Sequence, residues 1–212
     1  ALVEVDWEVL EPVIDPYEAI SDGAPQLYDE VKNNISVIEA TVHGDVESAL
    51  ANSAIRIKAN IRAPRCHPMP MEPRGIVAMF DPMSQGLTFW TSTQAPHWNR
   101  NSIAESLGLS QAQVRAIAPE VGGGFGCKIG AYPEEFVVAA AAMILRKPVK
   151  WMETRSENFL VTNHGRNQWS EFEAGADATG KLTALKARIV LDSGAYPKAL
   201  DLIVSCTLAP KN

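Results

Sequence analysis

A run of glycines in the middle of the chain is the segment best suited to chemistry. It reads Val121-Gly122-Gly123-Gly124-Phe125-Gly126-Cys127-Lys128, and we call residues 122–128 the glycine loop. Consecutive glycines admit positive φ angles and leave backbone N–H groups unshielded by side chains. Such a loop can cradle an anion or an oxo group. The glycines alone are equally typical of a tight strand-to-helix turn that holds no ligand.

Two common nucleotide-binding loops do not fit this segment. A Walker A loop ends in Gly-Lys-Ser/Thr, which Cys127-Lys128-Ile129 does not supply. A dinucleotide-binding fingerprint that starts at Gly124-x-Gly126 needs glycine or alanine at position 129, where Ile129 stands. The sequence therefore disfavours ATP and NAD as ligands of the glycine loop.

The elements expected around the loop alternate between strands and helices. Turn residues and the period of the apolar positions predict strands at 36–43, 55–62, 75–80, 87–91, 114–118, 149–152, 169–174 and 182–191. Asp45 is expected to cap a helix over 46–52, and a second helix is expected over 98–107, ending before Gly108. This order of elements predicts an α+β fold with mixed sheets and packed helices.

The helix after the glycine loop has the clearest boundaries. Pro133 suits the first helical position, Glu134 and Glu135 favour the positive end, and Pro148 stops the helix. Residues 136–145 are apolar on every face, which predicts burial on most sides. The alanines at 139–142 predict close approach to a neighbouring element.

Composition excludes several classes of protein. Of the 212 residues 46% are hydrophobic and 21% charged, which is ordinary for a globular protein, and a net charge of −6 argues against nucleic acid as a partner. No apolar run reaches the ~20 residues of a membrane span. Three cysteines without a Cys-x-x-Cys pair and four scattered histidines predict neither a disulfide framework nor a metal site built by the protein. We expect a reducing, cytoplasmic location.

Both ends of the chain look cut from a longer protein. Residues 2–9 alternate like a strand with no lead-in, and the proline-rich stretch 11–26 is typical of a connecting loop. We expect residues 1–35 to be the tail of a preceding domain with a linker, and residues 36–212 to be the N-terminal part of the next domain.

Several blocks of the sequence together resemble one known family. They are Met71-Glu72-Pro73-Arg74-Gly75, Thr93-Gln94-Ala95-Pro96-His97, the segment 114–128, the segment 148–158, and Asp192-Ser193-Gly194-Ala195-Tyr196. In this order and spacing the chain resembles the large subunit of the molybdenum hydroxylases, the group that includes xanthine dehydrogenase, aldehyde oxidase and aerobic carbon monoxide dehydrogenase. The resemblance implies the first molybdopterin-binding domain of that subunit.

The resemblance also implies a site and a reaction. In the family the matching glutamine hydrogen-bonds an oxo ligand of the molybdenum, and the glycine-loop N–H groups contact the metal's ligands and the pterin. By resemblance, Gln94 takes the first role, with Gly123, Gly124, Phe125 and Gly126 taking the second. The implied reaction is oxidative hydroxylation of an aldehyde, carbon monoxide or an aromatic heterocycle with oxygen from water. The general-base glutamate would lie beyond Asn212.

The same resemblance implies cofactors and partners outside this chain. The cofactor is expected to be molybdenum-molybdopterin, in its cytosine dinucleotide form, with FAD and iron–sulfur clusters on partner subunits or domains. The expected partners are these iron–sulfur and flavin subunits, the rest of the large subunit and a small-molecule substrate. Without them, the 212-residue chain is expected to be inactive alone.

For the other residues with reactive or charged side chains, and for the tryptophans, we expect structural roles. His97 is expected to pack under the glycine loop at a helix start, and Cys127 to be structural. Glu72 and Arg74 are expected to hold a strand in register. The tryptophans are expected to be core or interface anchors; they are Trp90, Trp98, Trp151 and Trp169.

The sequence leaves the substrate open. Xanthine dehydrogenase-type members of the family carry a glutamate at the position of Ile129. This difference favours the carbon monoxide dehydrogenase-like and bacterial aldehyde dehydrogenase branches of the family. Two alternatives also stay open: a non-catalytic module whose glycine loop holds a plain anion, and an assembly fragment of a split large subunit.

Overall fold

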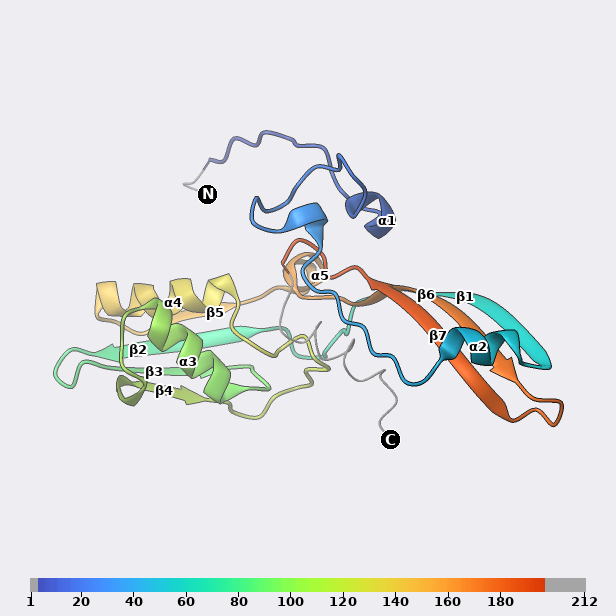
Figure 1. Ribbon diagram of the computed structural model, residues 1–212. Coiled ribbons are helices and arrows are strands. Elements are labelled where there is room, and N and C mark those ends of the chain that lie inside the picture. The colour runs from blue at the N-terminus through green and yellow to red at the C-terminus, as the bar shows by residue number, and fades with distance from the viewer. Residues whose placement is uncertain (1–3, 197–212) are drawn as a thin grey trace. The chain divides into compact units, whose positions relative to one another are not determined.

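The computed structural model describes residues 4–196 of the chain (Figure 1). These divide into two compact units. The first unit combines residues 4–65 with residues 166–196, and the second unit is residues 66–165. The expected division of the chain at residues 35 and 36 stays a prediction.

The second unit is built on a four-stranded mixed sheet. Its strands are β2 (Gly75–Asp81), β3 (Gly86–Thr91), β4 (Val114–Ile117) and β5 (Val149–Met152), in the order β4-β3-β2-β5. β2 and β3 form an antiparallel hairpin, β4 runs parallel to β3, and β5 runs antiparallel to β2. The expected α+β class with a mixed sheet is confirmed.

Two helices cover one face of this sheet. They are α3 (Pro96–Ser106) and α4 (Pro133–Leu145), and the shorter helices η2 (Gln111–Gln113) and α5 (Arg155–Val161) lie in connecting segments. The alternation of side chains along a strand sends one set of residues from β2, β3 and β4 toward the helices. The buried core consists of Ile76, Ala78, Leu87, Phe89, Ile103, Ala104, Val114, Val138, Ala139 and Ala142.

Helix α4 starts and stops where the sequence predicts, but one of its faces is open. Ala139 and Ala142 are fully buried, as the run of alanines predicts. Val137 is 66% exposed and Ile144 80% exposed, so the prediction of burial on most sides was wrong for this unit. The cause is geometric, because the unit offers the helix a single sheet to pack on. Within residues 4–196, no helix has the length and apolar character needed to cross a membrane.

The first unit contains a three-stranded sheet. Its strands are β1 (Ile55–Cys66), β6 (Gly165–Ala176) and β7 (Leu182–Leu191), in the order β1-β6-β7. Helix α2 (Val46–Ala51) packs on β7, and the Asp45 carboxylate accepts the expected capping hydrogen bond from the Ser48 N–H at 3.0 Å. Helices α1 (Pro16–Ala19) and η1 (Lys32–Asn34) precede them.

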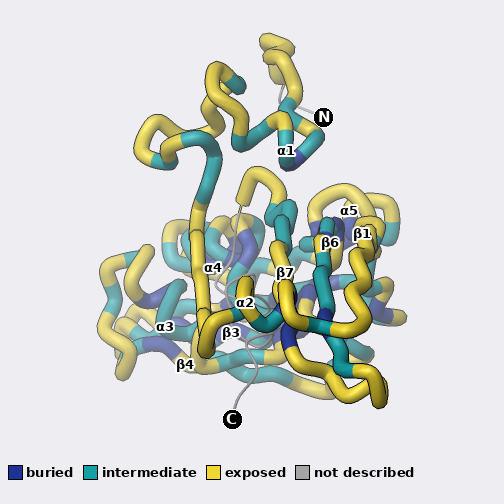
Figure 2. The backbone as a smooth tube through the Cα atoms, turned by 45° about the vertical axis from the view of Figure 1, so that its right-hand side comes forward, coloured by how far each residue is buried: buried dark blue, intermediate teal, exposed yellow. Residues whose placement is uncertain are grey.

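The prediction of a strand was wrong for two segments. Residues 4–9 and 36–43 have no regular secondary structure, and residues 1–3 lie outside the described part of the chain. Both segments are almost entirely exposed (Figure 2). An alternating pattern becomes a strand only where a neighbouring strand pairs its N–H and C=O groups, and the first unit supplies no such neighbour to either segment among the described residues.

The close packing of α4 on the sheet gives a test. Ala142→Leu adds three carbons to a fully buried position, and overpacking of this kind costs about 1–3 kcal/mol of the free energy of unfolding. Val137→Leu enlarges an exposed residue of the same helix and should leave stability unchanged. Chemical denaturation of both variants compares the two costs, and equal stability would contradict the packing described here.

Candidate functional site

The topology brings the candidate residues to one end of the second unit's sheet. β2 begins at this end, because Ile76 pairs with Thr91, the last residue of β3. β4 is parallel to β3, and β5 is antiparallel to β2, so both strands also end here. Residues 70–74, 92–95, 118–132 and 153–158 therefore converge, although they are far apart in the sequence.

Gln94 lies directly against the glycine loop. Its side-chain carbonyl accepts hydrogen bonds from the Gly126 N–H at 3.0 Å and the Lys128 N–H at 3.2 Å. The backbone N–H of Gln94 donates to the Lys128 carbonyl at 2.9 Å. These bonds fix which way the amide faces. Its NH₂ group is left without a hydrogen-bond partner in residues 4–196 and can donate to a ligand.

Three consecutive N–H groups of the glycine loop are unpaired. The Gly122 N–H donates to Glu72, the Cys127 N–H donates to the Gly124 carbonyl, and the last part of the loop is bonded to Gln94 as described. The N–H groups of residues 123–125 have no acceptor within the described residues. Backbone N–H groups in proteins are nearly always paired, so three adjacent unpaired donors indicate a place for an external acceptor.

The glycines of the loop are required for two different reasons. Gly123 and Gly126 have φ angles of +92° and +90°, which side chains disfavour. Gly122 and Gly124 are instead required by close approach. A Cβ on Gly122 would lie 2.6 Å from the Glu72 Cβ, and one on Gly124 would lie 2.4 Å from the Gln94 Cδ. Gly122 and Gly124 thus leave room for the side chains of Glu72 and Gln94, which pack directly against the loop.

Phe125 stands at the outer side of the loop. It has a φ of +52°, an uncommon angle for a residue with a side chain, and it is 72% exposed. Its ring lies over Gly123, where an added Cβ would meet the Phe125 Cε2 at 2.8 Å. The aromatic ring therefore borders the row of unpaired N–H groups.

An ion pair between a buried lysine and a partly exposed glutamate lies beneath the loop. The Lys128 ammonium donates to the Glu72 carboxylate at 2.8 Å and to the Ser92 hydroxyl at 2.6 Å, and the Lys128 side chain is fully buried. Glu72 Oε2 also accepts from the Ser92 hydroxyl and the Gly122 N–H. Burial opposes ionisation of Glu72, but its hydrogen bonds from Lys128 and Ser92 outweigh burial and lower the pKa of Glu72.

A second ion pair, buried on both sides, joins the start of β2 to the end of β5. Arg74 donates to Glu153 Oε1 through Nε at 3.1 Å and Nη2 at 2.5 Å, and its backbone N–H donates to Oε2 at 3.0 Å. Glu153 also accepts from Asn158, and the Arg74 guanidinium stacks on the Tyr132 ring at 3.7 Å. The structural roles expected for Glu72 and Arg74 are confirmed, but each acts as one half of an ion pair that the sequence does not reveal.

Another buried carboxylate sits at the start of α4. Glu135 accepts from the Tyr132 N–H at 2.9 Å, from the Asn99 amide at 3.1 Å and from the Thr91 hydroxyl. Burial raises the pKa of Glu135 and outweighs these hydrogen bonds and the nearby charge of Arg74, which favour the ionised form. It ties the last residue of β3 to both helices.

The other sequence candidates lie outside the row of unpaired donors. Cys127 is buried, its thiol donates to the Gly124 carbonyl at 3.0 Å, and burial raises its pKa, which confirms a structural role. His97 is exposed on α3, so the expectation that it packs under the loop was wrong. Trp151 packs against the core as expected, whereas Trp98 is 51% exposed.

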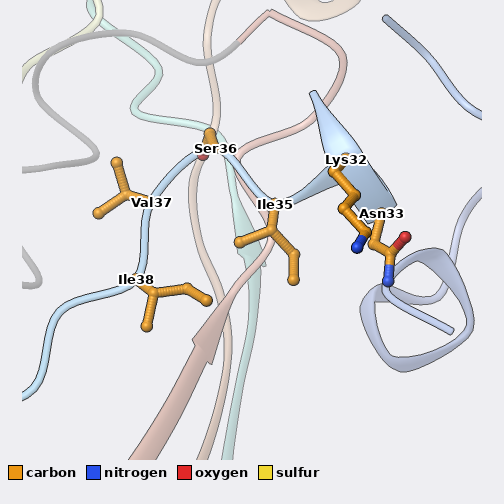
Figure 3. A pocket seen from close by; sticks show the side chains of 6 residues that line it. All are labelled: Lys32, Asn33, Ile35, Ser36, Val37 and Ile38. Atoms are coloured by element: carbon orange, nitrogen blue, oxygen red, sulfur yellow. The ribbon is translucent and has the colours of Figure 1, made fainter. Parts of the chain in front are cut away.

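The described residues of this region hold no metal site built from protein side chains. Among residues 4–196 no group of three or more His, Cys, Asp or Glu side chains is arranged to hold a metal ion. The pocket in Figure 3 belongs to the first unit and does not include the glycine loop; its lining residues are Lys32, Asn33, Ile35, Ser36, Val37 and Ile38. The loop is a row of unpaired donors at a sheet end, with Gly124 buried, Gly123 half-buried and Phe125 exposed, and it is suited to an oxygen-rich or anionic group that brings its own metal.

Fold and site thus define an α+β domain whose glycine loop offers backbone donors to such a group. The family model for the molybdopterin cofactor-binding domain matches residues 27–209. The chain belongs to this family, and the resemblance inferred from the sequence is confirmed.

Characterised relatives are large subunits of hydroxylating and dehydrogenating enzymes. The chain is 33% identical to the carbon monoxide dehydrogenase large chain of Hydrogenophaga pseudoflava, over 94% of this chain and 26% of the relative. It is 34% identical to the nicotine 6-hydroxylase large subunit of Paenarthrobacter nicotinovorans, over 92% of this chain and 24% of the relative. The chain therefore spans about a quarter of the length of these relatives.

Solved structures agree with the family assignment. The chain superposes on Cu,Mo-CO dehydrogenase in its carbon monoxide-reduced state with a TM-score of 0.80 and 32% identity, over 90% of this chain and 26% of that chain. Aldehyde oxidoreductase from Desulfovibrio gigas gives a TM-score of 0.81 at 22% identity, over 89% of this chain and 21% of that chain, which supports the fold.

The two buried glutamates predict opposite responses of stability to pH. Burial raises the pKa of Glu135, so its contribution is fully present below the ordinary value of about 4.3 and is lost as pH rises through the raised pKa. For Glu153, burial is outweighed by the hydrogen bonds from Arg74, and its pKa is lowered. Its contribution is present above about 4.3 and is lost as pH falls through the lowered pKa.

Single Gln substitutions test these signs. Relative to the wild type, Glu135→Gln should gain stability as pH rises from about 4 to about 7, whereas Glu153→Gln should lose it over the lower part of that range. Unfolding midpoints in denaturant at several pH values measure both slopes. Parallel slopes for the two variants would refute the assignment.

Proposed function

We propose that this chain forms the cofactor-holding part of a molybdenum hydroxylase large subunit. One observation carries the proposal: the unpaired N–H groups of residues 123–125 stand beside the unpaired NH₂ group of Gln94. Four neutral donors in one place suit the oxygen and sulfur acceptors of a molybdenum-pterin group. The family to which the chain belongs is defined by binding that cofactor.

The residues named from the sequence would share the binding. Gly123, Gly124 and Phe125 would donate from the backbone, and Gln94 would donate from its amide. Gly126 was assigned the same role, but its N–H already donates to Gln94, so its part is to orient that amide. When bound, the cofactor supplies oxidative hydroxylation with oxygen drawn from water.

The donors in this chain carry no formal charge. Gln94 is neutral, and the Lys128 ammonium is buried and paired with Glu72. A neutral donor set can hold an oxygen-rich group while that group changes its charge during turnover. The chain's own task in the reaction is therefore to bind and orient, and proton transfer falls to a residue outside it.

The names of the relatives suggest the range of substrates. They act on carbon monoxide, nicotine and aldehydes. We infer a small substrate with an electrophilic carbon: carbon monoxide, an aldehyde or an aromatic heterocycle. Ile129 stands where purine-oxidising members carry a glutamate, so purines are disfavoured. The inferred branch is that of carbon monoxide dehydrogenase and the bacterial aldehyde dehydrogenases.

The complete protein is inferred to be a multi-subunit cytoplasmic complex. The cytosine dinucleotide form of the cofactor, an iron–sulfur subunit and a flavin subunit would complete it. Residues 36–212 would be the N-terminal part of the cofactor-binding domain, and residues 1–35 the tail of the domain before it.

The native protein that contains this chain tests the proposal. It should hold close to stoichiometric molybdenum and release CMP on acid hydrolysis. It should also reduce an artificial electron acceptor with an aldehyde, carbon monoxide or N-heterocycle, incorporating ¹⁸O from labelled water. Absence of both molybdenum and pterin would refute the proposal. Tight binding of phosphate or sulfate instead would favour a plain anion-binding module.

Gln94→Glu isolates the amide donor. Glutamate keeps an oxygen for the N–H groups of Gly126 and Lys128, but it replaces the NH₂ donor by a charged acceptor. We expect kcat to fall on the order of 10²–10³-fold, the usual cost of losing one preorganised donor. Gln85→Glu adds the same charge in the exposed turn after β2 and should leave kcat unchanged. Equal activity of the Gln94→Glu variant and the wild type would remove Gln94 from the site.

A further inference from the structure

Lys128 ends the glycine loop but turns away from the unpaired N–H groups. Its side chain is fully buried, and its ammonium is held by Glu72 at 2.8 Å and Ser92 at 2.6 Å. A lysine in a ligand-binding loop usually offers its charge to the ligand. Here the ammonium is already bonded to Glu72 and Ser92 inside the protein, so it is not free to bond a ligand at the loop.

The backbone of the same residue is bonded to Gln94 in both directions. The Lys128 N–H donates to the Gln94 side chain, and the Gln94 N–H donates to the Lys128 carbonyl at 2.9 Å. Lys128 therefore connects two side chains that press on the loop: Gln94 through its backbone and Glu72 through its ammonium.

Glu72 holds the opposite end of the loop. Its backbone N–H donates to the Gly122 carbonyl at 3.1 Å, and its carboxylate accepts from the Gly122 N–H at 2.8 Å. The chain of bonds from Gly122 through Glu72 to the Lys128 ammonium, and back along the loop, is a closed ring. A ring of this kind fixes the distance between the two ends of the loop.

We propose that Lys128 is a positioning residue, which closes this ring and so holds the N–H groups of residues 123–125 open for an oxygen-rich acceptor. The proposal rests on the proposed function, because the acceptor is the molybdenum-pterin group. Without the ring, a glycine-rich segment has many other conformations, and its N–H groups can pair with nearby carbonyls.

Three variants of the native protein separate positioning from simple stability. Lys128→Met removes the buried ammonium and leaves the partly exposed Glu72 carboxylate without its cation, so it should lower both the Tm and the molybdenum content. Adding Glu72→Gln removes the unpaired charge and should restore the Tm. The ring stays open in this double variant, because no ammonium links the two ends, so its molybdenum content should stay low. We expect a deficit on the order of 10-fold, as is usual when the residues supporting a ligand are lost.

Two controls complete the design. Lys150→Met removes the same kind of charge from an exposed position of β5 and should leave the molybdenum content unchanged. Ile103→Ala opens the buried core on α3, so it lowers the Tm without touching the ring. The readouts are molybdenum per folded polypeptide, measured by elemental analysis, and the Tm.

The outcomes distinguish this inference from the proposed function. Recovery of molybdenum together with the Tm in the double variant, or an equal loss in Ile103→Ala at the same Tm, would overturn the positioning role alone. If the wild type holds no molybdenum, the proposed function itself fails. A low molybdenum content in the double variant, with full loading of Ile103→Ala, supports the ring.

Discussion

The hydrogen bonds between the Gln94 carbonyl and the N–H groups of Gly126 and Lys128 are the constraint on which the site depends. They take up the acceptor of the amide and two donors of the glycine loop at once. The donors that remain unpaired within residues 4–196 are the NH₂ group of Gln94 and the N–H groups of residues 123–125. Gln94 therefore orients its own donor toward the same side as a row of backbone donors.

The sheet topology makes that contact possible. Gln94 follows β3, the loop follows β4, Glu72 precedes β2, and Glu153 follows β5. These segments meet because β3, β4 and β5 all end where β2 begins. Two ion pairs then lock the junctions: Lys128 with the partly exposed Glu72, and Arg74 with Glu153, which are both buried. Removing one partner of a buried pair such as Arg74 and Glu153 typically costs about 3–5 kcal/mol, so this end of the sheet is held firmly.

The sequence predicts much of this unit because its signals are local. Pro133 and Pro148 bracket α4, and turn residues separate β2 from β3, so these elements are where the pattern indicates. The expected strands at residues 4–9 and 36–43 fail for the opposite reason, since an alternating pattern cannot reveal whether a neighbouring strand exists. Helix α5 was not predicted at all, although Thr154 and Glu157 form a capping box that could have indicated its start.

From the sequence we named the residues expected to contact a ligand, but not the residues that support them. Gln94 and the glycines were named from the resemblance, and the structure brings them into contact. The supporting residues were not, because Lys128 looks like a surface lysine, and its burial depends on a glutamate 56 positions earlier in the chain. The run of glycines could have indicated close packing against the loop. Gly122 and Gly124 do not need a positive φ angle, and a side chain at either position would collide with Glu72 or Gln94.

Residue-resolved amide hydrogen exchange on the native protein, with and without its cofactor, tests the central claim most directly. Exchange at Gly123, Gly124 and Phe125 should be fast in the cofactor-free protein and should slow strongly when the cofactor is bound. Exchange at Gly126 and Lys128 should be slow in both forms, because Gln94 already accepts their hydrogens. Unchanged fast exchange at residues 123–125 in the fully loaded protein would contradict the account.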